Sequence, residues 1–212
     1  MKEEADIIIE KYNLEFLVKT QNMKFYENDD IALCLSGIWK VQAAIATTTL
    51  IEKFSPKTLV NIGIAGNANP KKINIGDVVL VDSCAQHDIY LPFPWSHNDY
   101  LKAPIFIESV SSEWRKFDFS VIENGKCITW DQFIDNQSKV KMLGQIHKAD
   151  CIEMEAFAFL SAAREFDLLD NCIIIKGISD WADSQAKTDH EDNLQLAMDN
   201  SVVILDTIIG SD

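Results

Sequence analysis

Several side chains that could transfer a proton follow a buried segment near the end of the chain. Cys172–Ile175 is an unbroken apolar run, typical of a strand in a sheet covered on both faces. Ser179, Asp180 and Asp183 come soon after it. Ligands of parallel α/β sheets bind beyond the carboxyl ends of the strands, where a partly desolvated carboxyl group can hold and donate a proton near neutral pH. Asp180 is therefore a candidate general acid, and the alternative is that it caps the next helix.

A second pair of carboxylates stands at the start of a predicted helix. Glu153 and Glu155 precede Ala156–Phe166, whose apolar spacing predicts a buried helix. Acidic side chains also favour the positive end of a helix dipole. The pair therefore has a structural explanation beside a role in a site.

A run of small residues follows another predicted strand. Thr58–Ile62 predicts a strand, and Gly63-Ile64-Ala65-Gly66 predicts a tight turn at its carboxyl end. Backbone N–H groups in such a turn can approach a ligand closely. The run is not G-x-G-x-x-G and has no P-loop lysine, so a turn without a ligand is the alternative.

Length, composition and charge indicate a globular protein and argue against two kinds of binding surface. The chain has 212 residues, of which 47% are hydrophobic and 25% charged, as expected for one large globular domain. Its net charge of −14 argues against a nucleic-acid or anionic-membrane surface. No secretory signal is visible, and no apolar run approaches the ~20 residues of a membrane span.

The cysteines and histidines indicate neither disulfides nor a metal site. The five cysteines include no C-x-x-C pair and lie mostly in apolar runs, which predicts reduced core residues of a cytoplasmic protein. The four histidines show no metal-ligand spacing. We predict that each histidine lies on the surface or in a loop.

Helical and strand patterns alternate along the chain, which predicts an α/β fold with a central mixed, mostly parallel sheet flanked by helices. Predicted helices are 2–11, 41–54, 106–114, 138–144, 156–166 and 194–209. Predicted strands are 31–35, 58–62, 75–82, one or two within 119–130, and the strand that begins at residue 172. Residues 21–30 are polar and predict a turn, whereas 84–100 are rich in aromatic residues and proline and predict a long surface loop.

The order of the short motifs carries more information than any one of them. The motifs are S-G-I-x-K-V at 36–41, N-x-G-x-A-G at 61–66, I-G-D-V-V at 75–79, H-D at 87–88, D-x-F-I at 131–134, E-M-E-A at 153–156 and G-I-S-D-x-A-D at 177–183. This series resembles the purine nucleoside phosphorylase/nucleosidase superfamily over nearly the whole chain. It is most similar to the methylthioadenosine/S-adenosylhomocysteine nucleosidases.

The resemblance implies a role for each matching residue. Asp180, next to Ser179, would be the acid at the purine. Phe133 would stack on the base, and Ile134 would offer it backbone hydrogen bonds. The Glu153-Met154-Glu155 segment would bind the ribose, with Glu155 on its hydroxyl groups and Met154 packed on the sugar. Ile64, Ala65 and Gly66 would line the site, and Glu4 would activate water at the anomeric carbon.

The chemistry of the reaction agrees with this implied arrangement. Cleavage of a purine N-glycosidic bond builds positive charge on the sugar and negative charge on the base. A protonated carboxyl group at the base and a carboxylate near the sugar address these two charges, with no need of a metal or cofactor. The resemblance implies a small-molecule purine nucleoside as substrate and a homodimer whose partner loop closes the 5′ end of the pocket.

The chain departs from the family pattern at four places. The family's first strand precedes the M-x-E-E turn, whereas this chain begins at the turn, so we expect a single domain over residues 1–212 that lacks that strand. Ile64 replaces a small hydroxyl residue, Lys176 replaces an arginine, and Trp39 stands where glycine is common. Because the hydroxyl and the arginine are expected near water and sugar, activity could be weaker or the nucleophile different.

Three hypotheses follow, and the first is preferred over the other two. The first is a hydrolase of 5′-substituted adenosines such as methylthioadenosine or S-adenosylhomocysteine. The second is a phosphorylase of the same fold, which would need arginines converging on the sugar; Arg115 and Arg164 lie in no motif. The third is a non-catalytic nucleoside-binding relative.

Overall fold

A six-stranded sheet forms the centre of the molecule. The computed structural model describes residues 1–89, 103–108, 110 and 116–210. The strands follow the order β6-β5-β7-β8-β4-β9, and β5 also pairs with β9, so the sheet curls back on itself. Their bounds are β4 Leu59–Asn67, β5 Val78–Gln86, β6 Ile105–Phe106, β7 Val121–Thr129, β8 Cys151–Glu153 and β9 Cys172–Asp180.

The sheet is mixed, as predicted. The pairs β4–β9, β5–β7 and β7–β8 are parallel, whereas β4–β8, β5–β6 and β5–β9 are antiparallel. The parallel register of β4 and β9 runs from Leu59 opposite Cys172 to Ala65 opposite Ile178. These two strands therefore carry the Asn61–Gly66 and Gly177–Asp180 motifs to the same end of the sheet.

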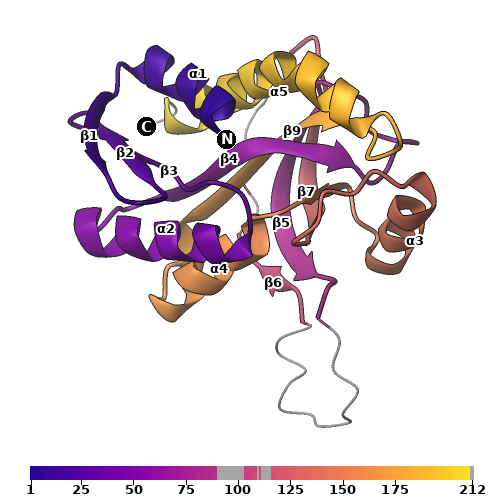
Figure 1. Cartoon of the computed structure of the whole chain (residues 1–212), viewed down its shortest axis with the longest axis horizontal. Coiled ribbons are helices and arrows are strands. Elements are labelled where there is room, and N and C mark those ends of the chain that lie inside the picture. Colours follow the sequence, from indigo (N-terminus) through magenta and orange to yellow (C-terminus); the bar gives the residue numbers. More distant parts are fainter. Residues whose placement is uncertain (90–102, 109, 111–115, 211–212) are drawn as a thin grey trace, which may run out of the picture.

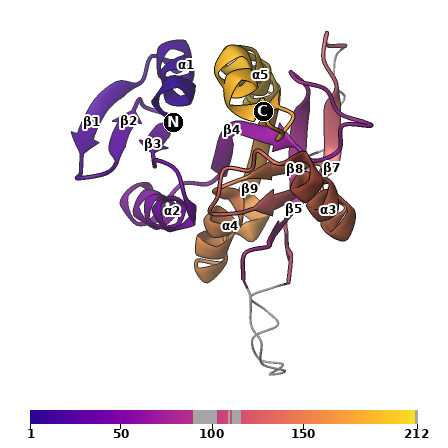
Figure 2. The ribbon, with the colours of Figure 1, turned by 45° about the vertical axis from the view of Figure 1, so that its right-hand side comes forward.

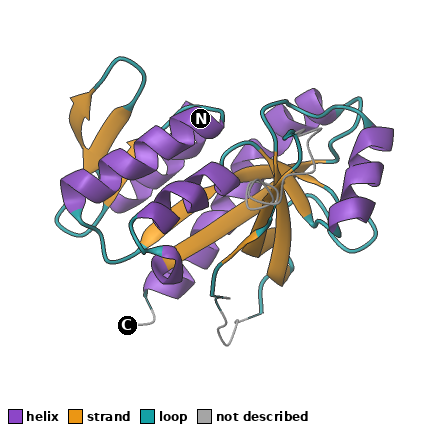
Figure 3. Cartoon of the chain, turned by 90° about the horizontal axis from the view of Figure 1, so that it is seen from below, coloured by secondary structure: helices purple, strands orange, loops and turns teal. Residues whose placement is uncertain are grey.

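Helices cover both faces of the sheet (Figures 1 and 3). The helix α5 (Ala186–Ile209) lies along β9 and β4, and α1 (Lys2–Tyr12) lies beside α5. The other face carries α2 (Lys40–Phe54) and α4 (Ala156–Glu165), and α3 (Gln137–His147) stands at one end. This arrangement confirms the predicted α/β class.

A second, three-stranded sheet lies between α1 and α2 (Figure 2). It is antiparallel and consists of β1 (Glu15–Lys19), β2 (Lys24–Glu27) and β3 (Ala32–Leu35). The prediction of a turn over residues 21–30 was therefore wrong for β2. Phe25 is 1% exposed and packs against α2, so tertiary burial formed a strand that a short polar segment did not suggest.

Several predicted element bounds also need correction. Gly63–Gly66 is no turn, because β4 continues through Asn67, and β9 likewise continues through Asp180. The segment Cys84–Gln86 belongs to β5 rather than to a loop, and residues 90–100 of that predicted loop lie outside the described residues. Phe106 lies in β6 and not in a helix, although residues 109 and 111–115 are also outside the described part. The last helix begins eight residues earlier than predicted, at Ala186.

Gly177 sets how closely α5 can approach the sheet. A Cβ atom at this residue would lie 2.2 Å from the backbone oxygen of Ala197 and 2.6 Å from Oγ of Ser201, both on α5. The absence of a side chain therefore lets the helix lie directly against β9. Within the described residues, no helix has the length and apolarity needed to cross a membrane.

We predict that Gly177→Ala lowers the free energy of unfolding by about 2 kcal/mol or more, because α5 would have to move away from β9. Urea unfolding of both proteins measures the change. Adding Ser201→Gly should not restore stability, since the backbone oxygen of Ala197 still obstructs the new methyl group. A variant as stable as the wild type would show that α5 shifts without cost.

Candidate active site

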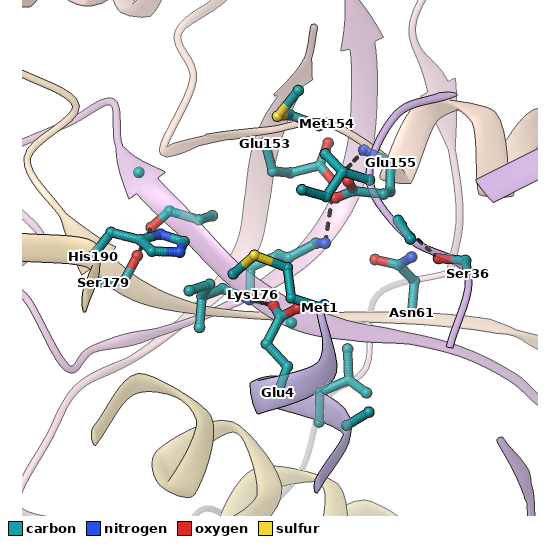
Figure 4. Close-up of a pocket in the computed structure, with 18 of the residues that line it drawn as sticks. Met1, Glu4, Ser36, Asn61, Glu153, Met154, Glu155, Lys176, Ser179 and His190 are labelled. Carbon is teal, nitrogen blue, oxygen red and sulfur yellow. Dashed lines mark hydrogen bonds and ion pairs between the residues drawn. The ribbon is translucent and has the colours of Figure 1, made fainter. Parts of the chain in front are cut away.

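One pocket gathers several of the sequence motifs at the end of β4 and β9 (Figure 4). Its walls come from the start of α1, the segment after β3, the strand β4, the β8–α4 connection, the end of β9 and the first turns of α5. All eleven site residues predicted from the sequence line it. They are Glu4, Ile64, Ala65, Gly66, Phe133, Ile134, Glu153, Met154, Glu155, Ser179 and Asp180.

Asp180 lies at one end of the pocket and is 3% exposed. Its Oδ2 accepts a hydrogen bond from the Ser179 hydroxyl at 2.8 Å, and its Oδ1 accepts one from the backbone N–H of Ala182 at 2.8 Å. It does not cap α5, whose N-cap residue is Gln185. Burial raises the pKa of Asp180, against the opposing effect of these two hydrogen bonds. The group is thus suited to hold a proton in the pocket.

Gly66 allows Asp180 to reach this position. A Cβ atom on Gly66 would lie 3.0 Å from Oδ1 of Asp180 and 3.0 Å from the side chain of Ala182. Gly66 therefore serves close packing within the sheet, and its pairing with β8 and β9 places it in a strand and not in a turn.

A buried ion pair forms the centre of the pocket floor. Lys176 Nζ lies 3.0 Å from Glu153 Oε2, and both side chains are at most 3% exposed. The Thr129 hydroxyl donates to Glu153 Oε1 at 2.5 Å, while the backbone N–H groups of Glu155 and Ala156 donate to Oε2 at 2.9 and 2.8 Å. Both oxygens of Glu153 are therefore occupied within the protein, and they fix the start of α4.

Each charge of this ion pair shifts the pKa of the other group toward its ionised form. Burial alone would raise the pKa of Glu153, but Lys176 and the hydrogen bonds to the carboxylate lower it below its ordinary value. Burial would lower the pKa of Lys176, but Glu153 and Glu155 raise it. Both groups stay ionised at neutral pH.

Glu155 stands at the N-terminus of α4, beside this ion pair (Figure 4). Its pKa is raised, first by burial and then by the nearby charge of Glu153, while Lys176 acts in the opposite direction. Glu155 Oε1 accepts a hydrogen bond from the backbone N–H of Trp39 at 3.3 Å. Trp39 adopts φ of 92°, a backbone conformation that favours glycine. The tryptophan that stands where glycine is common is therefore sterically strained.

Glu4 enters the pocket from the first turn of α1. Its Oε1 accepts a hydrogen bond from the backbone N–H of Ile64 at 3.0 Å, and its Oε2 contacts the backbone nitrogen of Met1. A Cβ atom on Gly63 would lie 2.9 Å from Glu4 Oε1 and 3.8 Å from Lys176 Nζ. The carboxylate of Glu4 and the amino group of Lys176 thus both lie beside Gly63 of β4.

Other pocket residues escaped the prediction from sequence. Asn61 points into the pocket, and its buried Oδ1 has no hydrogen-bond partner among the described residues. Ser36 and Asn61 each stand at the start of a quoted motif, so their positions in the motifs could have indicated them. His190 had been predicted to lie on the surface or in a loop, which was wrong, because it lines the pocket from α5. No spacing in the sequence pointed to it.

The five cysteines are free, as predicted. Four of them are buried, and Cys84, Cys127 and Cys151 occupy adjoining positions on β5, β7 and β8. Within the described part of the chain, no group of three or more His, Cys, Asp or Glu side chains is arranged to hold a metal ion.

Known proteins share this architecture over their whole length. The 5′-methylthioadenosine/S-adenosylhomocysteine nucleosidase of Staphylococcus haemolyticus is 28% identical over 222 aligned residues, which cover 99% of this chain and 96% of that protein. The corresponding nucleosidase of Neisseria meningitidis, solved with methylthio-immucillin-A, has a TM-score of 0.85 and 26% identity. The match covers 100% of this chain and 96% of that protein. The Helicobacter pylori nucleosidase with butyl-thio-DADMe-Immucillin-A has a TM-score of 0.84, 21% identity and coverage of 100% and 95%, so it supports the fold alone.

The family model of the phosphorylase superfamily matches residues 1–210, nearly the entire chain. The pocket lies where the segments 61–66, 153–155 and 179–182 of this chain meet. The chain belongs to the phosphorylase superfamily.

Proposed function

We propose that the protein is a nucleosidase that hydrolyses the N-glycosidic bond of 5′-substituted adenosines, such as methylthioadenosine or S-adenosylhomocysteine, and releases adenine. The observation that carries the proposal is that three carboxyl groups, those of Asp180, Glu155 and Glu4, line one pocket. Relatives that carry the nucleosidase name cover the whole chain.

The three carboxyl groups have different environments, which suits different tasks. Asp180, whose pKa is raised by burial, donates a proton to the departing purine. Phe133 stacks on the base, and the backbone of Ile134 hydrogen-bonds to it. Glu155 accepts hydrogen bonds from the ribose hydroxyl groups, with Met154 packed on the sugar.

Glu4 activates water at the anomeric carbon. Its Oε1 is held by the Ile64 N–H at 3.0 Å and its Oε2 contacts the amino group of Met1, so the carboxylate has a defined position beside Gly63. Glu153 contributes by holding Glu155 and α4 in place rather than by free acceptor oxygens of its own. Ile64, Ala65, Gly66 and Ser179 complete the wall.

Water is a better candidate for the nucleophile than phosphate. The pocket residues that the structure describes include no arginine, and Lys176 is already paired with Glu153. A phosphate dianion would require several convergent cationic donors.

We further propose that two copies form a homodimer in the cytoplasm. Exposed apolar side chains gather at the start of α2, at Ile38, Trp39, Val41 and Ile45. Lys40, at the start of α2, forms an ion pair with Asp88 at 2.5 Å. Asp88 comes two residues before the aromatic segment of the sequence that begins at residue 90. A second copy seated here would remove the apolar patch from water and cover the edge of the pocket at Ile38. The unpaired cysteines agree with a reducing compartment.

Asp180→Asn tests the role of the acid. The wild type should release adenine from methylthioadenosine at the same rate with and without phosphate. The variant should keep the fold, because the two side chains are nearly isosteric, but lose about 10²-fold or more of the rate. Adenine release measured by chromatography decides this, and an undiminished variant would refute the assignment. A rate that depends on phosphate would favour a phosphorylase.

Glu155→Gln tests the ribose contact. We expect the affinity for methylthioadenosine to fall about tenfold or more, whereas the affinity for free adenine changes little, because adenine has no ribose hydroxyl groups. Calorimetry on both ligands gives the comparison. Equal losses for the two would show that Glu155 serves only the start of α4.

Val41→Glu combined with Ile45→Glu tests the dimer. The wild type should sediment as a dimer at micromolar concentration, and the double variant should sediment as a monomer, because both glutamates would be buried in the interface. Met142→Glu combined with Ile146→Glu is the matched control, since these residues are also exposed and apolar but lie on α3. A monomeric wild type, or dissociation by the control alone, would contradict the proposed interface.

A further inference from the structure

His190 brings an imidazole to the same end of the pocket as Asp180. It belongs to the first turns of α5 and lines the pocket wall (Figure 4). Its Nδ1 lies 4.0 Å from Oδ2 of Asp180, and its side chain is 22% exposed whereas that of Asp180 is 4% exposed. The imidazole therefore lies between the buried carboxyl group and solvent.

The ring has a defined orientation. His190 meets Phe133 edge-on, with ring centroids 6.0 Å apart and an interplanar angle of 85°. Phe133 is the residue proposed to stack on the base, so the imidazole, the aromatic platform and the acid surround the same part of the pocket.

Few other polar groups compete for the proton of Asp180. The Ser179 hydroxyl and the Ala182 N–H are neutral donors to its oxygens. The charged groups that act on it are His190 and Asp189, both from the first turn or two of α5, and they act in opposite directions. Of these two residues, His190 is the one that lines the pocket.

We propose that His190 is a positioning residue that shares one proton with Asp180 and so keeps that proton at the base end of the pocket at neutral pH. This inference rests on the proposed function of Asp180 as the acid. Nδ1 of His190 and Oδ2 of Asp180 are 4.0 Å apart, so a proton that leaves the carboxyl group can be held on the imidazole, beside the carboxylate that stabilises it. The shared proton passes through Asp180 to the purine nitrogen, which leaves the pair without it, and the pair takes up another proton from water after adenine leaves.

The sign of the effect follows from this sharing. A lone Asp180 would lose its proton, and with it the acid form, as the pH rises through its own pKa. With His190 present, that proton moves to the imidazole and remains available until the pair loses it at higher pH. The imidazole therefore extends activity toward alkaline pH.

The pH dependence of kcat/KM for methylthioadenosine tests the proposal. His190→Phe should keep the rate on the acid side within about threefold of the wild type. Its alkaline limb should move to lower pH by about one unit, which is about a tenfold lower rate beyond the limb. His190→Gln, which keeps a polar side chain but cannot carry the proton, should show the same displacement. A uniform fall at every pH, or an unmoved limb in both variants, would overturn the proposal.

A matched control separates this effect from the general charge of α5. Lys187→Gln removes a positive charge from the same turn at an exposed residue that does not line the pocket. Its alkaline limb should coincide with that of the wild type. A displacement equal to that of His190→Phe would assign the effect to helix charge and reject the shared proton.

Nuclear magnetic resonance gives a readout that does not need turnover. The His190 imidazole signals are those lost in His190→Phe, and their titration should move to lower pH in Asp180→Asn, since a neutral amide no longer stabilises the imidazolium. An unchanged titration of the His190 signals in Asp180→Asn would show that the two residues do not share a proton. If the pair is present but no adenosine analogue is hydrolysed, the proposed function fails while the shared proton stands.

Discussion

The buried ion pair between Lys176 and Glu153 is the interaction on which the rest of the site depends. Removing either charge alone would leave the other unpaired in a region with almost no solvent, which is strongly destabilising. The same carboxylate accepts the backbone N–H groups of Glu155 and Ala156, so it fixes the first turn of α4. Through these bonds one ion pair joins β9 and β8 to α4 and sets where Glu155 stands.

Close approach of backbones is the second constraint. Gly63 and Gly66 leave room for Glu4 and Asp180 beside β4, and Gly177 leaves room for α5 beside β9. Glu4 and Asp180 therefore stand where β4 lacks a side chain. Ile64 departs from the small hydroxyl residue expected there, yet the hydrogen bond to Glu4 comes from its backbone N–H, which any residue other than proline supplies. This departure leaves the position of Glu4 intact.

The departures at Lys176 and Trp39 change the contacts of the site more than the departure at Ile64 does. A lysine presents a compact charge where an arginine would present a fork of donors, so it pairs with Glu153 without a bidentate contact. Trp39 has an unfavourable backbone conformation and donates its backbone N–H to Glu155, while its side chain is 47% exposed. Backbone strain clusters at functional sites, and this strained residue contacts Glu155. The proposed dimer interface would bury its side chain.

The sequence by itself determined the α/β class, most helices and the strand at Cys172, because apolar periodicity reports which face of an element is buried. It also determined the eleven predicted pocket residues, because ordered motifs specify them. It did not reveal β2, the continuation of β4 through Gly66, or the place of His190. Phe25 is buried by contacts with α2, and Gly66 is held in a strand by partners on β8 and β9. His190 approaches Asp180 where α5 packs against β9. Those contacts join residues that are distant along the chain, so only the tertiary structure could decide them.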